Sequence, residues 1–165
     1  AIRYPRGGDE FEGLKPLEEI EEGKWEVLHE GKDIALIATG KMVQHSLKAY
    51  KILLEKGIKV TLINAAFIKP LDKELLNKLM DKKYKIITVE DGIKKGGFGS
   101  SLLEYLNEYN YKEKVKILGY KDEFVEQGNV KLLYNEYGLD AEGIVQSVLE
   151  LSKKRSKLWQ IKSRD

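Results

Sequence analysis

The sequence contains no cysteine and only two histidines, His29 and His45. The missing cysteines exclude disulfide bonds, thiolate metal ligands and a cysteine nucleophile. Neither histidine has a second histidine or a carboxylate at the spacing that is typical of a zinc site. The sequence therefore gives little support for a metal centre or for catalysis by histidine.

Long apolar runs and a strong charge of one sign are missing as well. No apolar stretch approaches the roughly 20 residues of a membrane-spanning helix. Lysine and arginine number 29 against 27 aspartates and glutamates, a net charge of +2, whereas nucleic-acid-binding domains usually carry a marked positive excess. We expect a globular, cytoplasmic protein of 165 residues that contacts neither nucleic acid nor membrane.

An apolar run from Asp33 to Gly40 forms the centre of the predicted fold. Such a run is typical of a strand in a parallel sheet that helices cover on both faces. A helical pattern follows and ends near Gly57, with apolar positions at Val43, Leu47, Tyr50 and Leu54, widened by Met42, Ala49 and Leu53. The run from Ile58 to Asn64 completes a strand–helix–strand unit.

Further strands are predicted at Tyr84–Glu90 and Lys114–Gly119, and an edge strand at Lys24–His29, where Trp25, Val27 and His29 alternate with charged residues. Asp72 and Asp140 are expected to cap helices, and Leu102, Leu103 and Leu106 to form the apolar side of another helix. The pattern predicts an α/β fold: a three-layer sandwich around a mostly parallel five-stranded sheet.

The chain divides into three parts. Residues 1–23 are interpreted as the end of a preceding domain and an acidic linker, residues 24–154 as the main domain, and residues 155–165 as a basic tail. The composition agrees with these boundaries, because the first part is rich in glutamate and the last part is rich in lysine and arginine.

Glycines gather in the loop from Gly96 to Ser101, between a strand and a helix. Such a loop could hold a phosphate on its N–H groups, but the spacing matches neither the dinucleotide fingerprint nor the P-loop. Close packing of the helix start is the simpler interpretation. Glu90 and Asp91 are adjacent at a strand end, where side chains diverge, so they do not suggest an acid–base pair.

Arg3 and Arg6 flank a Tyr-Pro dipeptide at the start of the chain. Guanidinium groups match the geometry of phosphate or carboxylate, so the two arginines are candidates for anion binding. Composition alone favours two solvated surface arginines over an anion site.

Five stretches together resemble the carboxyl-terminal domain of the 1-deoxy-D-xylulose-5-phosphate synthases, thiamine-diphosphate enzymes of the transketolase superfamily. They are Ala1–Gly7 (AIRYPRG), Phe67–Asp72 (FIKPLD), Thr88–Gly92 (TVEDG), Gly96–Ser100 (GGFGS) and Gly138–Ile144 (GLDAEGI). The resemblance covers nearly the whole chain. It departs at Gln127, where relatives commonly have a histidine.

The resemblance implies one antiparallel edge strand and a role in a larger enzyme. Such enzymes condense pyruvate with glyceraldehyde 3-phosphate, using thiamine diphosphate and Mg²⁺ bound in two preceding domains. This chain is then expected to bind no cofactor or metal, to hold no catalytic residue, and to pair with the N-terminal and middle domains in a homodimer. Arg3 matches a family arginine that reaches the substrate phosphate, and Arg6 is a weaker candidate.

Two alternatives remain open from the sequence. The chain could be a separate carboxyl-terminal subunit of a split transketolase or of a 2-oxoacid dehydrogenase-type enzyme. It could also be a ligand-binding α/β domain that uses the loop from Gly96 to Ser101 at a strand's carboxyl end.

Overall fold

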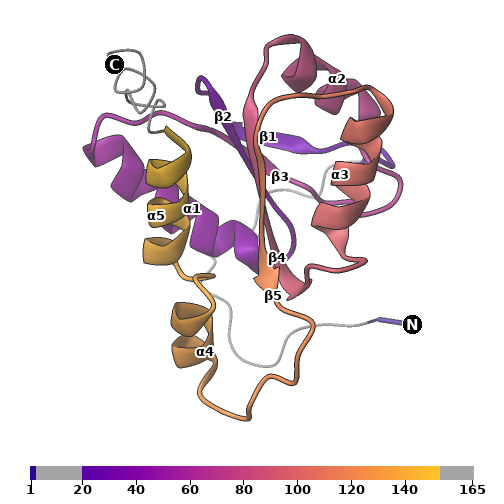
Figure 1. Ribbon diagram of the computed structural model, residues 1–165. Helices are drawn as coiled ribbons and strands as arrows, with labels where there is room; N and C mark the ends of the chain where they lie inside the picture. Colours follow the sequence, from indigo (N-terminus) through magenta and orange to yellow (C-terminus); the bar gives the residue numbers. More distant parts are fainter. Residues whose placement is uncertain (3–19, 153–165) are drawn as a thin grey trace, which may run out of the picture.

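The computed structural model describes residues 1–2 and 20–152, and its centre is one five-stranded sheet (Figure 1). The strand order is β1-β3-β2-β4-β5. Strands β2 to β5 run parallel, and β1 pairs antiparallel with β3 at one edge. The predicted sheet with one antiparallel edge strand is confirmed. The strands are β1 (Glu26–His29), β2 (Ile34–Ala38), β3 (Thr61–Asn64), β4 (Lys85–Ile93) and β5 (Val115–Tyr120).

Helices cover both faces of the sheet, which confirms the three-layer sandwich. Figure 1 shows α1 and α5 on one face and α2 and α3 on the other, while α4 lies below the end of β5. None of the described helices is both long and apolar enough to span a membrane. The helices are α1 (Met42–Glu55), α2 (Lys73–Asp81), α3 (Phe98–Glu108), α4 (Val130–Glu136) and α5 (Ala141–Ser152).

The central strand β2 is buried along its whole length, as its apolar run predicts. Successive side chains of a strand point to opposite faces, so neighbours enter different cores. Leu36 packs in the cluster that α1 and α5 cover, and Ile37 packs in the cluster under α2 and α3. The sheet therefore separates two hydrophobic cores.

Two aspartates cap helices at the predicted positions. One carboxylate oxygen of Asp72 accepts a hydrogen bond from the Leu75 N–H at 2.9 Å, and the other accepts one from the Trp25 N–H at 2.9 Å. Asp140 accepts from the Gly143 N–H at 2.8 Å at the start of α5. The first aspartate thus joins the start of α2 to the segment that leads into β1.

The predicted inner faces of β1 and α1 are wrong in part. In β1 the register shifts between Val27 and His29, so Leu28 packs against the core and Val27 is exposed. Helix α1 packs against α5 as well as the sheet, which moves its buried side away from Leu54. Leu103 of α3 is also exposed, whereas its helical neighbours Leu102 and Leu106 are buried.

Candidate functional site

Parallel sheets bind ligands outside the carboxyl ends of their strands. At this edge the longest strand, β4, continues three residues further than predicted, to Ile93. Its pairing with β5 is interrupted between Val89 and Ile93. Glu90 and Asp91 lie in this irregular stretch, and they are the first residues to consider as functional groups.

The Glu90 carboxylate is inserted into the start of α3. Its two oxygens accept hydrogen bonds from the Phe98 N–H at 2.8 Å and from the Gly99 N–H at 2.9 Å, and the residue is 5% exposed. A carboxylate at a helix N-terminus neutralises the partial positive charge of the first amides. The anion position of this helix is therefore filled by the chain's own side chain.

The glycines of this loop serve close packing. A Cβ atom at Gly99 would lie 2.6 Å from both Ile117 and Thr88, and one at Gly97 would overlap the Glu90 carboxylate. The helix start thus lies directly against β4 and β5. These contacts support the packing interpretation of the loop. The Phe98 and Gly99 N–H groups, which a bound phosphate would need, already donate to Glu90.

Asp91 points to a different set of partners. The Tyr134 hydroxyl of α4 donates a hydrogen bond to Asp91 Oδ2 at 2.8 Å. Burial, together with the nearby Asp91 charge, raises the pKa of Tyr134 and of Tyr120 above the ordinary phenol value. Glu90 and Asp91 therefore diverge, as predicted, and Asp91 ties α4 to the end of β4 while both phenols stay neutral.

Neither histidine is placed as a metal ligand. His29 stacks on Tyr50 with ring centroids 4.1 Å apart, and His45 meets Tyr134 edge to face at 5.0 Å. Within residues 1–2 and 20–152 there is no group of three or more histidine, aspartate or glutamate side chains that could hold a metal ion. The described part of the chain therefore offers no cluster of carboxylate or imidazole ligands that fits a magnesium ion.

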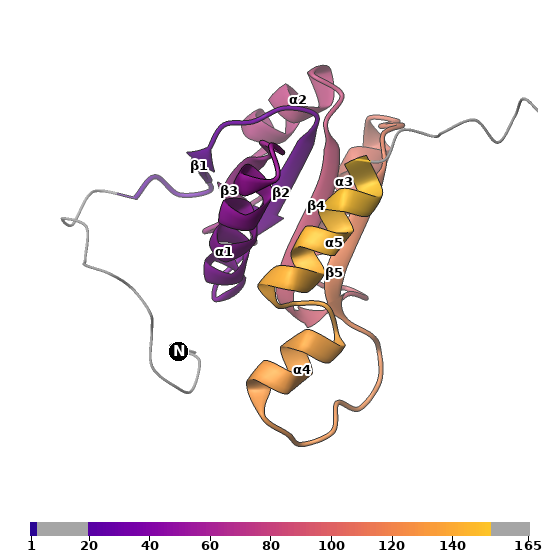
Figure 2. The same cartoon turned by 90° about the vertical axis from the view of Figure 1, so that its left-hand side faces the viewer.

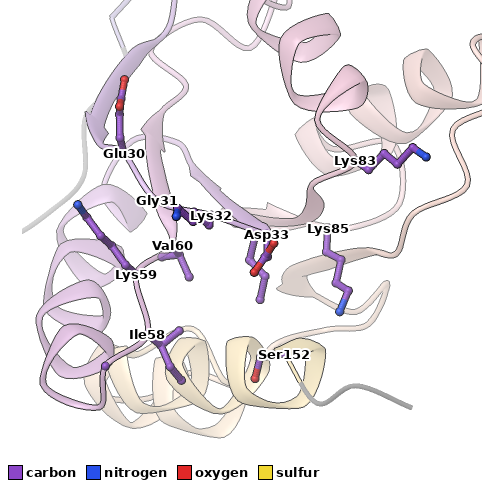
Figure 3. A pocket seen from close by; sticks show the side chains of 12 residues that line it. Glu30, Gly31, Lys32, Asp33, Ile58, Lys59, Val60, Lys83, Lys85 and Ser152 are labelled. Carbon is purple, nitrogen blue, oxygen red and sulfur yellow. The ribbon is translucent and has the colours of Figure 1, made fainter.

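A cavity of about 950 Å³ lies at the opposite, amino edge of the sheet (Figure 3). Four lysines are among the residues that line it: Lys32, Lys59, Lys83 and Lys85. Figure 3 shows the Lys59 and Lys83 side chains pointing away from each other. The Lys85 ammonium donates to the Leu151 carbonyl at 2.9 Å, which completes the end of α5. These cations do not converge on one point, so the cavity is not an organised anion site.

The two predicted phosphate-binding residues, Arg3 and Arg6, lie outside the described residues. Their role stays a prediction. Gln127, where relatives commonly have a histidine, lies in the exposed loop between β5 and α4. No sequence pattern indicates the Asp91–Tyr134 pair, because the two residues are 43 positions apart and belong to different elements.

Comparison with known proteins identifies the class to which this fold belongs. The sequence model of the family described as "Transketolase, C-terminal domain" matches residues 23–144. The chain belongs to this family. The match covers the five strands, α1 to α4 and the start of α5, so the edge that carries Glu90 and Asp91 is part of the shared fold.

More particularly, the chain is similar to the carboxyl-terminal region of 1-deoxy-D-xylulose-5-phosphate synthases. It is 58% identical over 152 residues to the synthase of Clostridium perfringens strain 13, covering 92% of this chain and 25% of the relative. The identity is 49% over 151 residues to the synthase of Clostridium beijerinckii, covering 92% and 24%. The chain spans about a quarter of the length of the curated relatives that it matches.

A solved structure has the same fold. It is described as "Split gene transketolase, inactive beta4 tetramer", and its TM-score against this chain is 0.76 at 34% sequence identity. The match covers 84% of this chain and 45% of the other.

Proposed function

We propose that the chain is the carboxyl-terminal domain of a 1-deoxy-D-xylulose-5-phosphate synthase. The observation that carries the proposal is the 58% identity along 92% of the chain, which exceeds the 34% identity to the split-gene transketolase. The complete enzyme joins pyruvate to glyceraldehyde 3-phosphate, releases carbon dioxide and forms 1-deoxy-D-xylulose 5-phosphate for isoprenoid biosynthesis. It is a cytoplasmic homodimer.

In this proposal the chemistry belongs to preceding domains, which bind thiamine diphosphate and Mg²⁺. When bound, the thiamine supplies the carbanion chemistry that pyruvate decarboxylation needs. The present chain provides a rigid platform instead. Its most prominent carboxylates are engaged internally, Glu90 by the α3 amides and Asp91 by Tyr134, and this supports a role without proton transfer.

The direct contribution of the chain to the reaction is Arg3, with Arg6 as a weaker candidate. A guanidinium forms paired, charge-assisted hydrogen bonds to phosphate oxygens. Arg3 would hold the phosphate of glyceraldehyde 3-phosphate and orient its aldehyde for attack, which is a positioning effect rather than acid–base catalysis. The placement of Arg3 in an Arg-Tyr-Pro-Arg-Gly stretch supports this assignment.

The split-gene transketolase supports a second candidate. That protein is described as an inactive tetramer of one subunit, so a domain of this fold exists there on a separate chain. If the present chain were also a separate subunit, it would be inactive alone and regain activity when mixed with a second polypeptide.

The test compares two samples: the complete gene product that contains this sequence, and the 165-residue chain alone. With thiamine diphosphate, Mg²⁺ and both substrates, the complete product is expected to form 1-deoxy-D-xylulose 5-phosphate. The chain alone is expected to form none and to give no heat on titration with thiamine diphosphate. Turnover by the chain alone, or no turnover by the complete product, would contradict the proposal.

A further inference from the structure

Large apolar side chains are exposed on the segment that connects β5 to α4 and on α4 itself. Residues 121–132 are all exposed. Phe124 is fully accessible and Leu132 is 71% exposed, and Val125 and Val130 are exposed on the same segment. We call these four residues the α4 apolar surface. Single exposed apolar residues are common, but several of them on one short segment indicate a contact surface.

The segment is fixed to the rest of the domain on its inner side. Tyr134 of α4 is 4% exposed, bonds Asp91 and packs against His45. The rings of Tyr120 and Tyr137 meet at 4.9 Å. Figures 1 and 2 show α4 and the preceding loop standing clear of the three layers. Val130 and Leu132 are therefore exposed on an anchored helix, and Phe124 and Val125 on the loop that leads into it.

The place of the segment indicates what covers it. Strand β1 begins at Glu26, opposite Asn64 at the end of β3, so the preceding chain reaches the sheet from the carboxyl edge. The α4 apolar surface lies beyond that same edge, after the end of β5. Helix α5, by contrast, ends at Ser152 beside the cavity of the amino edge.

The length of the relatives also indicates that the preceding polypeptide covers this surface. The chain matches the carboxyl-terminal region of relatives about four times as long, so most of such a polypeptide precedes it. We propose that the α4 apolar surface docks on that preceding, thiamine-diphosphate-binding part of the polypeptide. Burying exposed side chains as large as Phe124 and Leu132 removes much apolar surface from water, which favours a specific contact between domains. The inference rests on the proposed function only in taking the chain as part of a longer synthase.

The test places the photo-crosslinking residue benzoylphenylalanine in the complete gene product, at Phe124 or Leu132. Matched controls carry it at Leu54 or Tyr109, which are 50% and 57% exposed and lie at the far ends of α1 and α3. The adducts are identified by mass spectrometry of the digested protein.

The expected result is an adduct between position 124 or 132 and residues that precede this chain, with a yield at least about tenfold above the controls. Adducts with residues 20–152 of a second copy would overturn the proposal in favour of self-association. Yields no higher than the controls would overturn it as well.

A second measurement does not depend on crosslinking chemistry. Amide hydrogen exchange of residues 121–132 should slow by at least roughly tenfold in the complete product relative to the isolated chain. Equal exchange in both samples would contradict docking. The synthase assay on the wild-type product separates the two proposals, because the docking contact can form in a complete protein that lacks this activity.

Discussion

Glu90→Ala is predicted to destabilise the domain severely. The substitution removes the acceptor of two N–H groups, those of Phe98 and Gly99, at 2.8 and 2.9 Å. Both residues are buried, so water does not easily replace the carboxylate. Each unsatisfied buried donor costs about 1–3 kcal/mol, and the loss of a negative charge at a helix start adds to this cost.

The expected loss is therefore about 3–6 kcal/mol, a large part of the roughly 5–15 kcal/mol that stabilise a domain. Urea unfolding of the 165-residue chain, followed by circular dichroism, measures it. Asp91→Ala is the matched control at the next position. Asp91 is exposed, so water can replace its carboxylate as the acceptor of the Tyr134 hydroxyl, and its loss should cost only about 1 kcal/mol.

Anion rescue provides an independent check of the Glu90 prediction. In Glu90→Ala the two N–H groups are free to bind a small carboxylate, so acetate or formate should restore part of the lost stability. The wild-type chain should gain nothing specific from these anions. A cost below about 1 kcal/mol for Glu90→Ala, or a cost no larger than that of Asp91→Ala, would refute the reasoning.

Two further predictions concern packing and pH. Gly99→Ala should lower the free energy of unfolding by about 1–3 kcal/mol, because its Cβ would lie 2.6 Å from Ile117. Gly128→Ala, whose nearest neighbour would lie at 3.8 Å, should change it by less than about 0.5 kcal/mol. Urea unfolding measures both variants, and equal effects would contradict the close packing at Gly99. Burial, with a smaller effect of Glu113, raises the pKa of Tyr111 to about 12 from 10.0. The folded state favours the neutral Tyr111 phenol, so this stabilisation is complete below pH 10 and is lost as the pH rises towards 12. Absorbance titration at high pH should show a late-titrating phenol that Tyr111→Phe removes. A titration curve that Tyr111→Phe leaves unchanged would contradict the raised pKa.

The sequence predicted the sheet and the helix caps because their signals are local. A continuous apolar run is sufficient to indicate β2, and Asp72 precedes its helix at the position where a cap is needed. Which side of α1 becomes buried depends on both the sheet and α5, and the sequence pattern of α1 alone does not show where α5 packs. Leu54, predicted on the apolar side of the helix, is therefore exposed. The register shift in β1 has no signal in a period-two pattern, which predicts Val27 on the same side of the strand as Trp25.

For the candidate site, the sequence predicts only that Glu90 and Asp91 do not act as a pair. Adjacent positions on a strand point apart, so the divergence of Glu90 and Asp91 followed from their order alone. Their partners did not, because Phe98 and Tyr134 come close only after the chain has folded. The α4 apolar surface was likewise not predicted. Phenylalanine is usually a core residue, and the exposure of Phe124 follows only from the folded arrangement of its segment.

The central claim is that this domain lends one arginine to chemistry performed elsewhere in a longer enzyme. Its most direct test is the steady-state kinetics of the complete gene product carrying Arg3→Ala, with Arg155→Ala in the basic tail as the control. Loss of a charge-assisted phosphate contact is worth about 1.5–3 kcal/mol, so kcat/KM for glyceraldehyde 3-phosphate should fall roughly 10- to 150-fold. The account predicts this loss with the KM for pyruvate nearly unchanged, and equal losses for both substrates would contradict it.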